Sequence, residues 1–156
     1  MADTRVKVAK DKAELVKSLR ADSADDTTKP FQTYAEVLVF AATLGAKRDR
    51  REPFAEFSKR DPDPIPYDVF RKYDKVVKLL AVFATKSPRV LADSDEAEES
   101  RIKIFEEYAN AGLEIIDNEI KGSVDHLERI LLFLSSERDE ITKQGGDFDL
   151  SNLLLM

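Results

Sequence analysis

The feature that most constrains the fold is a nearly uninterrupted apolar run, VLVFAATL, at residues 37–44. Thr33 and Glu36 stand before it with the T-x-x-E spacing of a capping box, which satisfies backbone N–H groups at the start of a helix. Gly45 follows the run, and glycine often ends a helix in the left-handed conformation. VLVF would also suit a strand, but the capping box and the alanines favour a helix. Because its own apolar residues point to all sides of this helix, we expect the helix to be buried on most sides.

The residues at the N-terminus are expected to form an extended arm followed by a short helix. Val6 and Val8 alternate with basic residues, and such period-two alternation is typical of extended chain. Asp11 and Glu14 have the spacing of a second capping box, so a short helix is predicted over about 12–21.

Two segments are predicted to lack regular structure. Residues 22–29 are polar and read as a loop. Residues 52–66 are rich in proline, which fixes its own backbone angle and holds the preceding residue in extended geometry. Phe54 and Phe57 would anchor this second segment against the core. Its prolines are Pro53, Pro62, Pro64 and Pro66.

A third helix is predicted over about 67–85, with Pro66 at its start. Its apolar residues recur at spacings of three and four, which indicates one buried stripe. The stripe consists of Val69, Tyr73, Val76, Leu80 and Phe83. A basic stripe on another face consists of Arg71, Lys75 and Lys78.

A long fourth helix should begin at the acidic run of residues 93–99 and continue to about Lys121. Carboxylates are favoured at that end because the unpaired N–H groups and the helix dipole attract negative charge. Gly112, in the middle of the helix, indicates either a close helix crossing or a tolerated flaw. The predicted buried side consists of Ile102, Phe105, Ala109, Leu113, Ile116 and Ile120.

Gly122 and Ser123 then predict a tight joint, with glycine ending one helix and serine capping the next. The last helix is expected over about 124–142, antiparallel to its predecessor. Its apolar stripe is predicted to be Val124, Leu127, Leu131 and Leu134.

These patterns together predict an all-α fold, a compact bundle of about five helices with the proline-containing segment between the second and third. A chain of 156 residues with 42% apolar and 36% charged residues suits one globular domain, over 1–156. We expect an extended arm at 1–10 and an apolar tail at 146–156. The tail ends in LLLM, so it is expected to dock on the core or, alternatively, on a neighbouring subunit of a homo-oligomer.

Several kinds of function are disfavoured by composition. The chain has no cysteine, which excludes disulfides, thiolate nucleophiles and thiolate metal sites. There is no leader-like start and no apolar run near ~18 residues, so we expect no membrane association and a cytoplasmic location. The net charge of −6 argues against a general nucleic-acid coat. Residues 1–60 are nonetheless slightly basic, with 13 Lys and Arg against 10 Asp and Glu, whereas residues 61–156 have 12 against 21.

No catalytic constellation is present, so we expect neither an enzyme nor a cofactor. His126 is the single histidine, and a surface or capping role suits its position near a helix start. A group of carboxylates could suggest a metal site, but the Glu-x-x-His motif of di-iron bundles is missing, and a solvated acidic face explains them better. No phosphate-binding loop, nucleophile elbow or zinc spacing occurs. These carboxylates are Glu106, Glu107, Glu114, Asp117 and Glu119.

The candidate binding site is a basic cluster just after the apolar helix. Arginine and lysine side chains can fix a protein on the phosphate backbone of DNA, and arginine can bind bidentately. Such clusters also occur on surfaces merely to solvate a loop, and no stacking aromatic residues are interleaved here. The predicted DNA-binding residues are Lys47, Arg48, Arg50, Arg51, Lys59 and Arg60.

Four blocks in series resemble a known family. They are KDKAELV at 10–16, the stretch PFQTYAEVLVFAATLGAKRDRREPF at 30–54, DPIPYDVF at 63–70 and IFEEYANAGLEII at 104–116. Their order and spacing are similar to the Dnd system-associated protein 4 family, also called DNA phosphorothioation-associated protein 4, over roughly residues 10–120. The resemblance implies a setting in bacterial systems that replace a phosphate oxygen of DNA with sulfur and use the mark in restriction and anti-phage defence. It carries no assigned site residues.

Three hypotheses follow from the residues and the resemblance. The first is a non-catalytic accessory protein that contacts the DNA backbone through the basic cluster. The alternative is an adaptor or regulator that binds other proteins of the same system without touching DNA. The third is an enzyme that uses the carboxylates of residues 106–119, which the motif analysis disfavours.

Overall fold

The computed structural model describes residues 4–23, 25–123 and 125–144, with side chains as far as residue 138. Over these residues the chain forms mainly helices, which confirms the predicted all-α fold. The α-helices are α1 (Ala13–Leu19), α2 (Tyr34–Lys47), α3 (Asp74–Thr85), α4 (Asp95–Ile120) and α5 (His126–Gln144). Three short 3-10 helices are η1 (Lys10–Lys12), η2 (Tyr67–Tyr73) and η3 (Pro88–Leu91), and the strands β1 (Arg5–Val6) and β2 (Ile65–Pro66) pair antiparallel.

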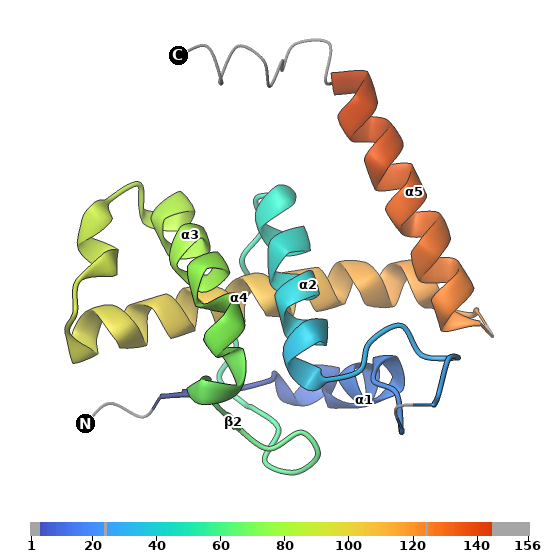
Figure 1. The fold of residues 1–156 in the computed structure, drawn as a ribbon, viewed down its shortest axis with the longest axis horizontal. Coiled ribbons are helices and arrows are strands. Elements are labelled where there is room, and N and C mark those ends of the chain that lie inside the picture. The colour runs from blue at the N-terminus through green and yellow to red at the C-terminus, as the bar shows by residue number, and fades with distance from the viewer. Residues whose placement is uncertain (1–3, 24, 124, 145–156) are drawn as a thin grey trace.

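The long helix α4 runs across the molecule, and both α2 and α3 cross it (Figure 1). Two glycines allow the close contact of α2 with α4. A Cβ added at Gly112 would lie 1.7 Å from the carbonyl oxygen of Ala41, and one at Gly45 would lie 2.3 Å from that of Tyr108. Of the two explanations for Gly112, the helix crossing is therefore the right one. The prediction that Gly45 ends its helix is wrong, because α2 continues past it and the left-handed residue is Asp49, with φ 52°.

The predicted start of α2 is confirmed. The Glu36 amide donates a hydrogen bond to Thr33 Oγ1 at 3.1 Å, and Glu36 Oε2 accepts one from the Gln32 amide at 2.9 Å. As expected, α2 is buried on most sides. Its buried apolar residues are Ala35, Val37, Leu38, Ala41, Ala42, Leu44 and Ala46.

The extended N-terminal segment belongs to the core. Val6 and Val8 are only 1% and 3% exposed. The predicted Asp11–Glu14 capping box is wrong, because η1 leads into α1 and no side chain caps that helix. The carboxylate of Asp11 lies 3.0 Å from the buried Lys12 ammonium, and this ion pair uses the group that was expected to cap the helix.

The helix predicted over 67–85 is divided into η2 and α3, and its buried face differs from the prediction. Val69 and Phe83 are 50% and 41% exposed, whereas Phe70 and Val77 are fully buried. The stripe was predicted at 3.6 residues per turn, but η2 has about three residues per turn, which rotates its side chains relative to those of α3. Leu80 is buried as predicted.

The fourth helix agrees with its prediction. Ser94 caps α4 by accepting a hydrogen bond from the Ala97 amide at 3.2 Å, and acidic residues occupy the first turn. All six predicted core residues are buried: Ile102, Phe105, Ala109, Leu113, Ile116 and Ile120.

The last helix is placed differently from the prediction. α5 leaves the end of α4 at a steep angle and does not lie antiparallel along it (Figure 1). Its cap is Asp125, whose Oδ1 accepts from the Glu128 amide at 3.0 Å, in place of the predicted Ser123. Gly122 adopts φ 81°, as a tight joint requires.

The inner face of α5 also differs from the predicted stripe. Ile130 and Phe133 are buried, whereas Leu131 and Leu134 are 55% and 40% exposed. Val124 and the apolar tail at 146–156 lie outside the described residues, and so does the predicted oligomer contact through that tail. Among the helices that the structure describes, none combines the length and the apolarity needed to cross a membrane.

Candidate functional site

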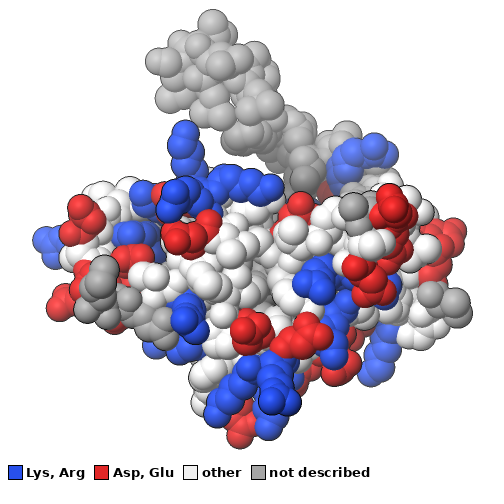
Figure 2. Space-filling view, turned by 60° about the horizontal axis from the view of Figure 1, so that its bottom comes forward, with Lys and Arg blue, Asp and Glu red and all other residues white. Residues whose placement is uncertain are grey.

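The structure separates the six predicted DNA-binding residues into two groups. Lys47, Arg48, Arg50 and Arg51 lie at the end of α2 and in the turn after it. Lys59 and Arg60 lie in the irregular segment before β2. On the face shown in Figure 2, basic and acidic side chains are interspersed. Which cations remain available therefore depends on their individual partners.

Lys47 and Arg48 hold α5. Both donate hydrogen bonds to the carboxylate of Glu137, whose side chain is only 9% exposed. Burial would raise the pKa of the Glu137 carboxyl, but the hydrogen bonds from Lys47 and Arg48 outweigh burial and lower this pKa below its ordinary value. One carboxylate thus pairs with both cations, so each of them is engaged within the fold and one net positive charge remains at this contact.

Arg51 similarly binds α4. Its Nε and Nη2 donate to Oε1 of the buried Glu107 at 3.1 and 2.8 Å, and its guanidinium lies 5.8 Å from the ring centroid of Tyr108. Arg50 is more weakly held, 4.0 Å from Glu52 with both side chains about half exposed. The basic turn is thus largely a connector between α2 and the two C-terminal helices.

Backbone contacts also fix this turn in place. The Glu52 amide donates to the Glu107 carbonyl at 3.1 Å, and Asn110 Nδ2 donates to the Glu52 carbonyl at 2.9 Å. The Arg50 amide donates to the Gly45 carbonyl at 2.9 Å. The turn is therefore part of the α2–α4 packing and not a free loop.

Lys59 and Arg60 are in a different environment. They follow Phe57, which pairs with the N-terminal segment through a bridge to Ala9 and through a 2.7 Å hydrogen bond from the Ser58 amide to the Val8 carbonyl. Within the described part of the chain, neither Lys59 nor Arg60 forms an ion pair with a carboxylate. Their charges remain available to a ligand.

This pairing brings an aromatic ring and further cations beside Lys59 and Arg60. The ammonium groups of Lys7 and Lys59 lie 4.8 and 5.9 Å from the ring centroid of Phe57. Lys10 lies 3.9 Å from Glu56, and both side chains are strongly exposed. We name Phe57 with Lys7, Lys10, Lys59 and Arg60 the Phe57 site.

Two hollows flank Phe57. The larger, of about 590 Å³, is lined by three cations, Lys10, Lys59 and Arg60, and by one carboxylate, Glu56. Ala13, Ala55 and the Phe57 ring supply its apolar wall. Because cations outnumber carboxylates, this hollow favours an anionic group such as a phosphate.

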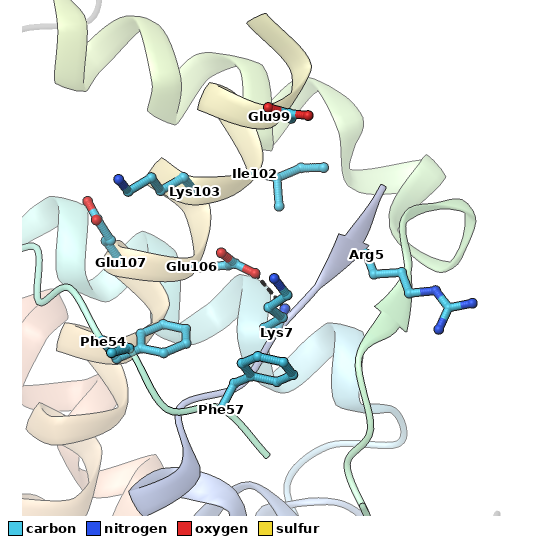
Figure 3. A pocket seen from close by; sticks show the side chains of 10 residues that line it. Arg5, Lys7, Phe54, Phe57, Glu99, Ile102, Lys103, Glu106 and Glu107 are labelled. Atoms are coloured by element: carbon cyan, nitrogen blue, oxygen red, sulfur yellow. Dashed lines mark hydrogen bonds between the residues drawn. The ribbon is translucent and has the colours of Figure 1, made fainter. Parts of the chain in front are cut away.

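The other hollow, of about 390 Å³, has charges of both signs (Figure 3). Phe54 and Phe57 lie on one side of it, and Glu99 and Ile102 come from α4 on another. Glu106 accepts a hydrogen bond from the Lys7 amide at 2.6 Å, which ties α4 to the N-terminal segment. This hollow is less selective for anions, since carboxylates balance its cations. Its charged lining consists of Arg5, Lys7, Lys103, Glu99, Glu106 and Glu107.

Sequence reasoning missed Lys7, Lys10 and the aromatic member of the site. The sequence did contain one relevant signal: the alternation around Val6 and Val8 places Lys7 on the outer side of the segment. The pairing of residues 8–10 with 56–58 joins distant parts of the chain, so it could not be predicted from any local sequence pattern. The expectation that aromatic residues are not interleaved with the cations therefore holds along the chain but not in space.

The carboxylates of α4 connect helices to their neighbours. Glu114 lies 3.0 Å from Lys12 and Glu119 lies 3.6 Å from Arg129, in addition to the Glu107 contact described above. Over the described residues, no group of three or more histidine or acidic side chains is placed to hold a metal ion.

Comparison with known proteins gives one match. The model of the family described as DNA sulphur modification system-associated protein 4 matches residues 5–153. No curated protein and no solved structure matches the chain.

Proposed function

The chain belongs to the family of DNA sulphur modification system-associated protein 4, and on this premise we propose that it is a non-catalytic accessory protein that contacts the DNA backbone. Family membership associates it with a DNA sulphur modification system, so the other proteins of that system are its expected partners. The proposed setting is modification and restriction of DNA in anti-phage defence.

The observation that carries the proposal is the Phe57 site. Lys59 and Arg60 are free of carboxylate partners within the described residues, and Lys10 lines the same hollow. Flexible cations around one hollow suit contact with phosphate oxygens, which contribute much of the affinity of proteins for DNA. Phe57 could also stack on an exposed base, although duplex binding does not require it.

The proposal gives the six predicted residues unequal roles. Lys59 and Arg60 would make the principal phosphate contacts, with Arg50 as a further, half-exposed candidate. Lys47, Arg48 and Arg51 would act mainly by holding α4 and α5, because each is bonded to a buried carboxylate. Their substitution should lower stability more than it lowers DNA affinity.

The test is duplex binding measured by fluorescence anisotropy over a range of salt concentrations. We expect salt-sensitive binding by the full chain, and we expect Lys59→Gln combined with Arg60→Gln to weaken it. The slope of log K against log salt should fall in magnitude by roughly two, about 0.9 for each lost phosphate contact. Duplexes with and without a phosphorothioate would show whether the sulfur mark alters affinity.

The matched control is Arg71→Gln combined with Arg89→Gln, which removes the same charge from exposed side chains of η2 and η3. This control should keep the wild-type slope, because overall charge alone has a small effect. Equal slopes in all three proteins would reject the Phe57 site. Absence of salt-sensitive binding by the wild-type chain would reject DNA contact itself.

The second candidate function is an adaptor that binds proteins of the same system without touching DNA. It is favoured by apolar side chains exposed on α5, where Leu132 is 56% exposed beside Leu131 and Leu134. Affinity purification with and without nuclease separates the two candidates. Partners that persist after nuclease treatment, together with no duplex binding in vitro, would favour the adaptor.

The absence of catalysis is part of the proposal. Three carboxylates of α4 support it, because they already form ion pairs with Arg51, Lys12 and Arg129 that connect elements of the fold. Metal analysis of the purified protein tests the absence of catalysis. Bound metal in stoichiometric amounts would support the enzyme hypothesis instead.

A further inference from the structure

The outward face of α3 has apolar side chains that the described structure covers only in part, since Val76 and Val82 touch the core at their edges and the Phe83 ring lies 6.4 Å from that of Tyr108. Leu79 is 68% exposed and Phe83 is 41% exposed, and Val76 and Val82 are half-buried beside them. These residues are spaced three or four apart around Leu79, so they share one side of the helix. We name Val76, Leu79, Val82 and Phe83 the α3 outward face.

The opposite side of α3 is already used by the core. Val77, Leu80 and Ala81 are buried there. The apolar residues on the outward side are therefore additional to those that the core requires. The exposed apolar side chains are therefore unlike scattered single surface leucines, which need no explanation.

The border of this face is cationic. The Lys86 ammonium lies 4.2 Å from the ring centroid of Phe83, and that of Lys72 lies 5.1 Å from the ring centroid of Tyr73. Lys75 is exposed one helical turn before Leu79. No ion pair involves these three lysines among the residues that the structure describes.

Carboxylates do not neutralise the face from within the helix. Asp74 is the one acidic residue of α3, and it is held on the flank by Lys78 at 2.9 Å and by the Tyr67 hydroxyl at 2.5 Å. Lys86 ends the helix in the left-handed conformation, with φ 55°. An apolar strip with cations at its border thus lies on the surface of a chain whose net charge is −6.

We propose that the α3 outward face docks an acidic amphipathic helix of a partner protein. The apolar side of such a helix would cover Leu79 and Phe83, and carboxylates at its edges would reach Lys72, Lys75 and Lys86. The three-and-four spacing of the face matches the spacing of apolar anchors on a second helix. Electrostatic complementarity would guide the approach and set the orientation.

Two other occupants fit this face less well. Duplex DNA would place phosphates against Leu79 and Phe83, which offer them no hydrogen bonds. A second copy that docked face to face would bring lysines against lysines, and like charges opposed across an interface are unfavourable. The α3 face and the Phe57 site belong to different elements, so this inference stands or fails independently of DNA contact.

The test uses two fluorescent peptides of about 18 residues, each with leucine at helical spacing, one with glutamate at the flanking positions and one with lysine. The full chain should bind the glutamate peptide at least about tenfold more tightly than the lysine peptide, the effect of a coupling of about 1.4 kcal/mol. Leu79→Ser should weaken binding of the glutamate peptide about tenfold. Lys75→Glu combined with Lys86→Glu should reverse the preference.

The matched control is Leu91→Ser, which removes an exposed leucine from η3 and should leave peptide binding unchanged. Thermal unfolding of each variant checks that the fold is retained. No binding of the glutamate peptide, equal binding of both peptides, or equal losses in Leu79→Ser and Leu91→Ser would each overturn the proposal.

The position of contact is tested with a photo-crosslinking residue placed at 79 in the full chain, in cells that contain the modification system. The expected product joins position 79 to an acidic, helix-forming segment of another protein. A product with DNA, or with a second copy of this chain, would overturn the proposal.

Discussion

At the scale of single residues, glycine has opposite significance at two positions of this chain. Gly112 has an ordinary helical backbone but no space beside it, since a Cβ would lie 1.7 Å from the Ala41 carbonyl oxygen. Gly122 has open space around it but adopts φ 81°, which L side chains rarely do. The first glycine is required by packing, and the second by backbone conformation.

This contrast predicts the effects of alanine. Gly112→Ala should lower the free energy of unfolding by about 3 kcal/mol, at the upper end of overpacking effects, because α2 must move away from α4. Gly122→Ala should cost only about 1–2 kcal/mol of backbone strain. Urea unfolding measures both. Helix propensity alone predicts that Gly112→Ala stabilises by about 1 kcal/mol, and that outcome would contradict the close crossing.

At the scale of elements, the 3-10 geometry of η2 decides which side chains of the third helical segment enter the core. Phe70 packs edge-on against Phe105, with ring centroids 5.5 Å apart, and lies 6.3 Å from Tyr67. Its neighbour Val69, which an α-helical period would bury, is half exposed. Within α3 itself, Leu80 and Ala81 are buried, whereas Phe83 is 41% exposed on the α3 outward face.

Alanine substitutions test this change of register. Phe70→Ala should lower the free energy of unfolding by about 3–5 kcal/mol, as expected for an aromatic residue removed from a core. Val69→Ala should change it by less than about 0.5 kcal/mol. Chemical denaturation with an unchanged m-value gives the comparison. Similar losses in both variants would indicate that Val69 faces the core after all.

The attachment of α5 depends on a single carboxylate that receives two cations. The pKa of Glu137 is lowered in the folded protein, so its ionised form favours the folded state. This contribution is complete above the ordinary pKa of 4.5 and is lost as the pH falls through the lower folded-state value. α5 should therefore be held firmly near neutral pH and more weakly in acid.

Glu137→Gln tests this attachment. At about pH 7 it should lower the free energy of unfolding by about 1–3 kcal/mol and speed hydrogen exchange along α5, because two charge-assisted hydrogen bonds are lost. The difference from wild type should shrink as the pH falls below 4.5. Glu128→Gln, at an exposed position of the same helix, is the control and should have little effect. A pH-independent difference would show that charge is not the cause.

At the scale of the whole molecule, the N-terminal segment joins parts of the chain that are distant in sequence. Its backbone binds the irregular segment at Glu56 and Ser58, and Thr4 accepts a hydrogen bond from the Tyr67 amide at 2.7 Å. Glu106 on α4 accepts from the same segment at Lys7. The Phe57 site exists only while these long-range contacts are formed.

The combined variant Val6→Ala with Val8→Ala tests this dependence. It should lower the free energy of unfolding by roughly 3 kcal/mol, because two buried side chains lose apolar contacts. Amide exchange at Ser58 and Tyr67 should rise, and duplex binding should weaken although no cation is removed. Lys10→Ala, at an exposed position, should change stability by less than about 0.5 kcal/mol. Unchanged exchange at Ser58 would contradict this coupling.

Much of the helical layout could be predicted from local pattern. The capping box at Thr33 and Glu36 and the buried side of α4 were correct, because each depends on neighbours within a few turns of one regular helix. Predictions went wrong where regular geometry changed, as in η2, or where another contact used the residue. Gly45 packs against the distant Tyr108, and Asp11 pairs with its neighbour Lys12, whose ammonium is buried.

The apolar run after Thr33 by itself determined that a buried helix lies at the centre of this protein, and the matching blocks determined the family. Only the tertiary structure decided which of the six predicted cations remain available. Glu137 and Glu107 come from helices far along the chain and form ion pairs with Lys47, Arg48 and Arg51, whereas Lys59 and Arg60 have no such partners within the described residues. The physical reason is that charge along a sequence is additive, but the availability of a charge depends on what the fold places beside it.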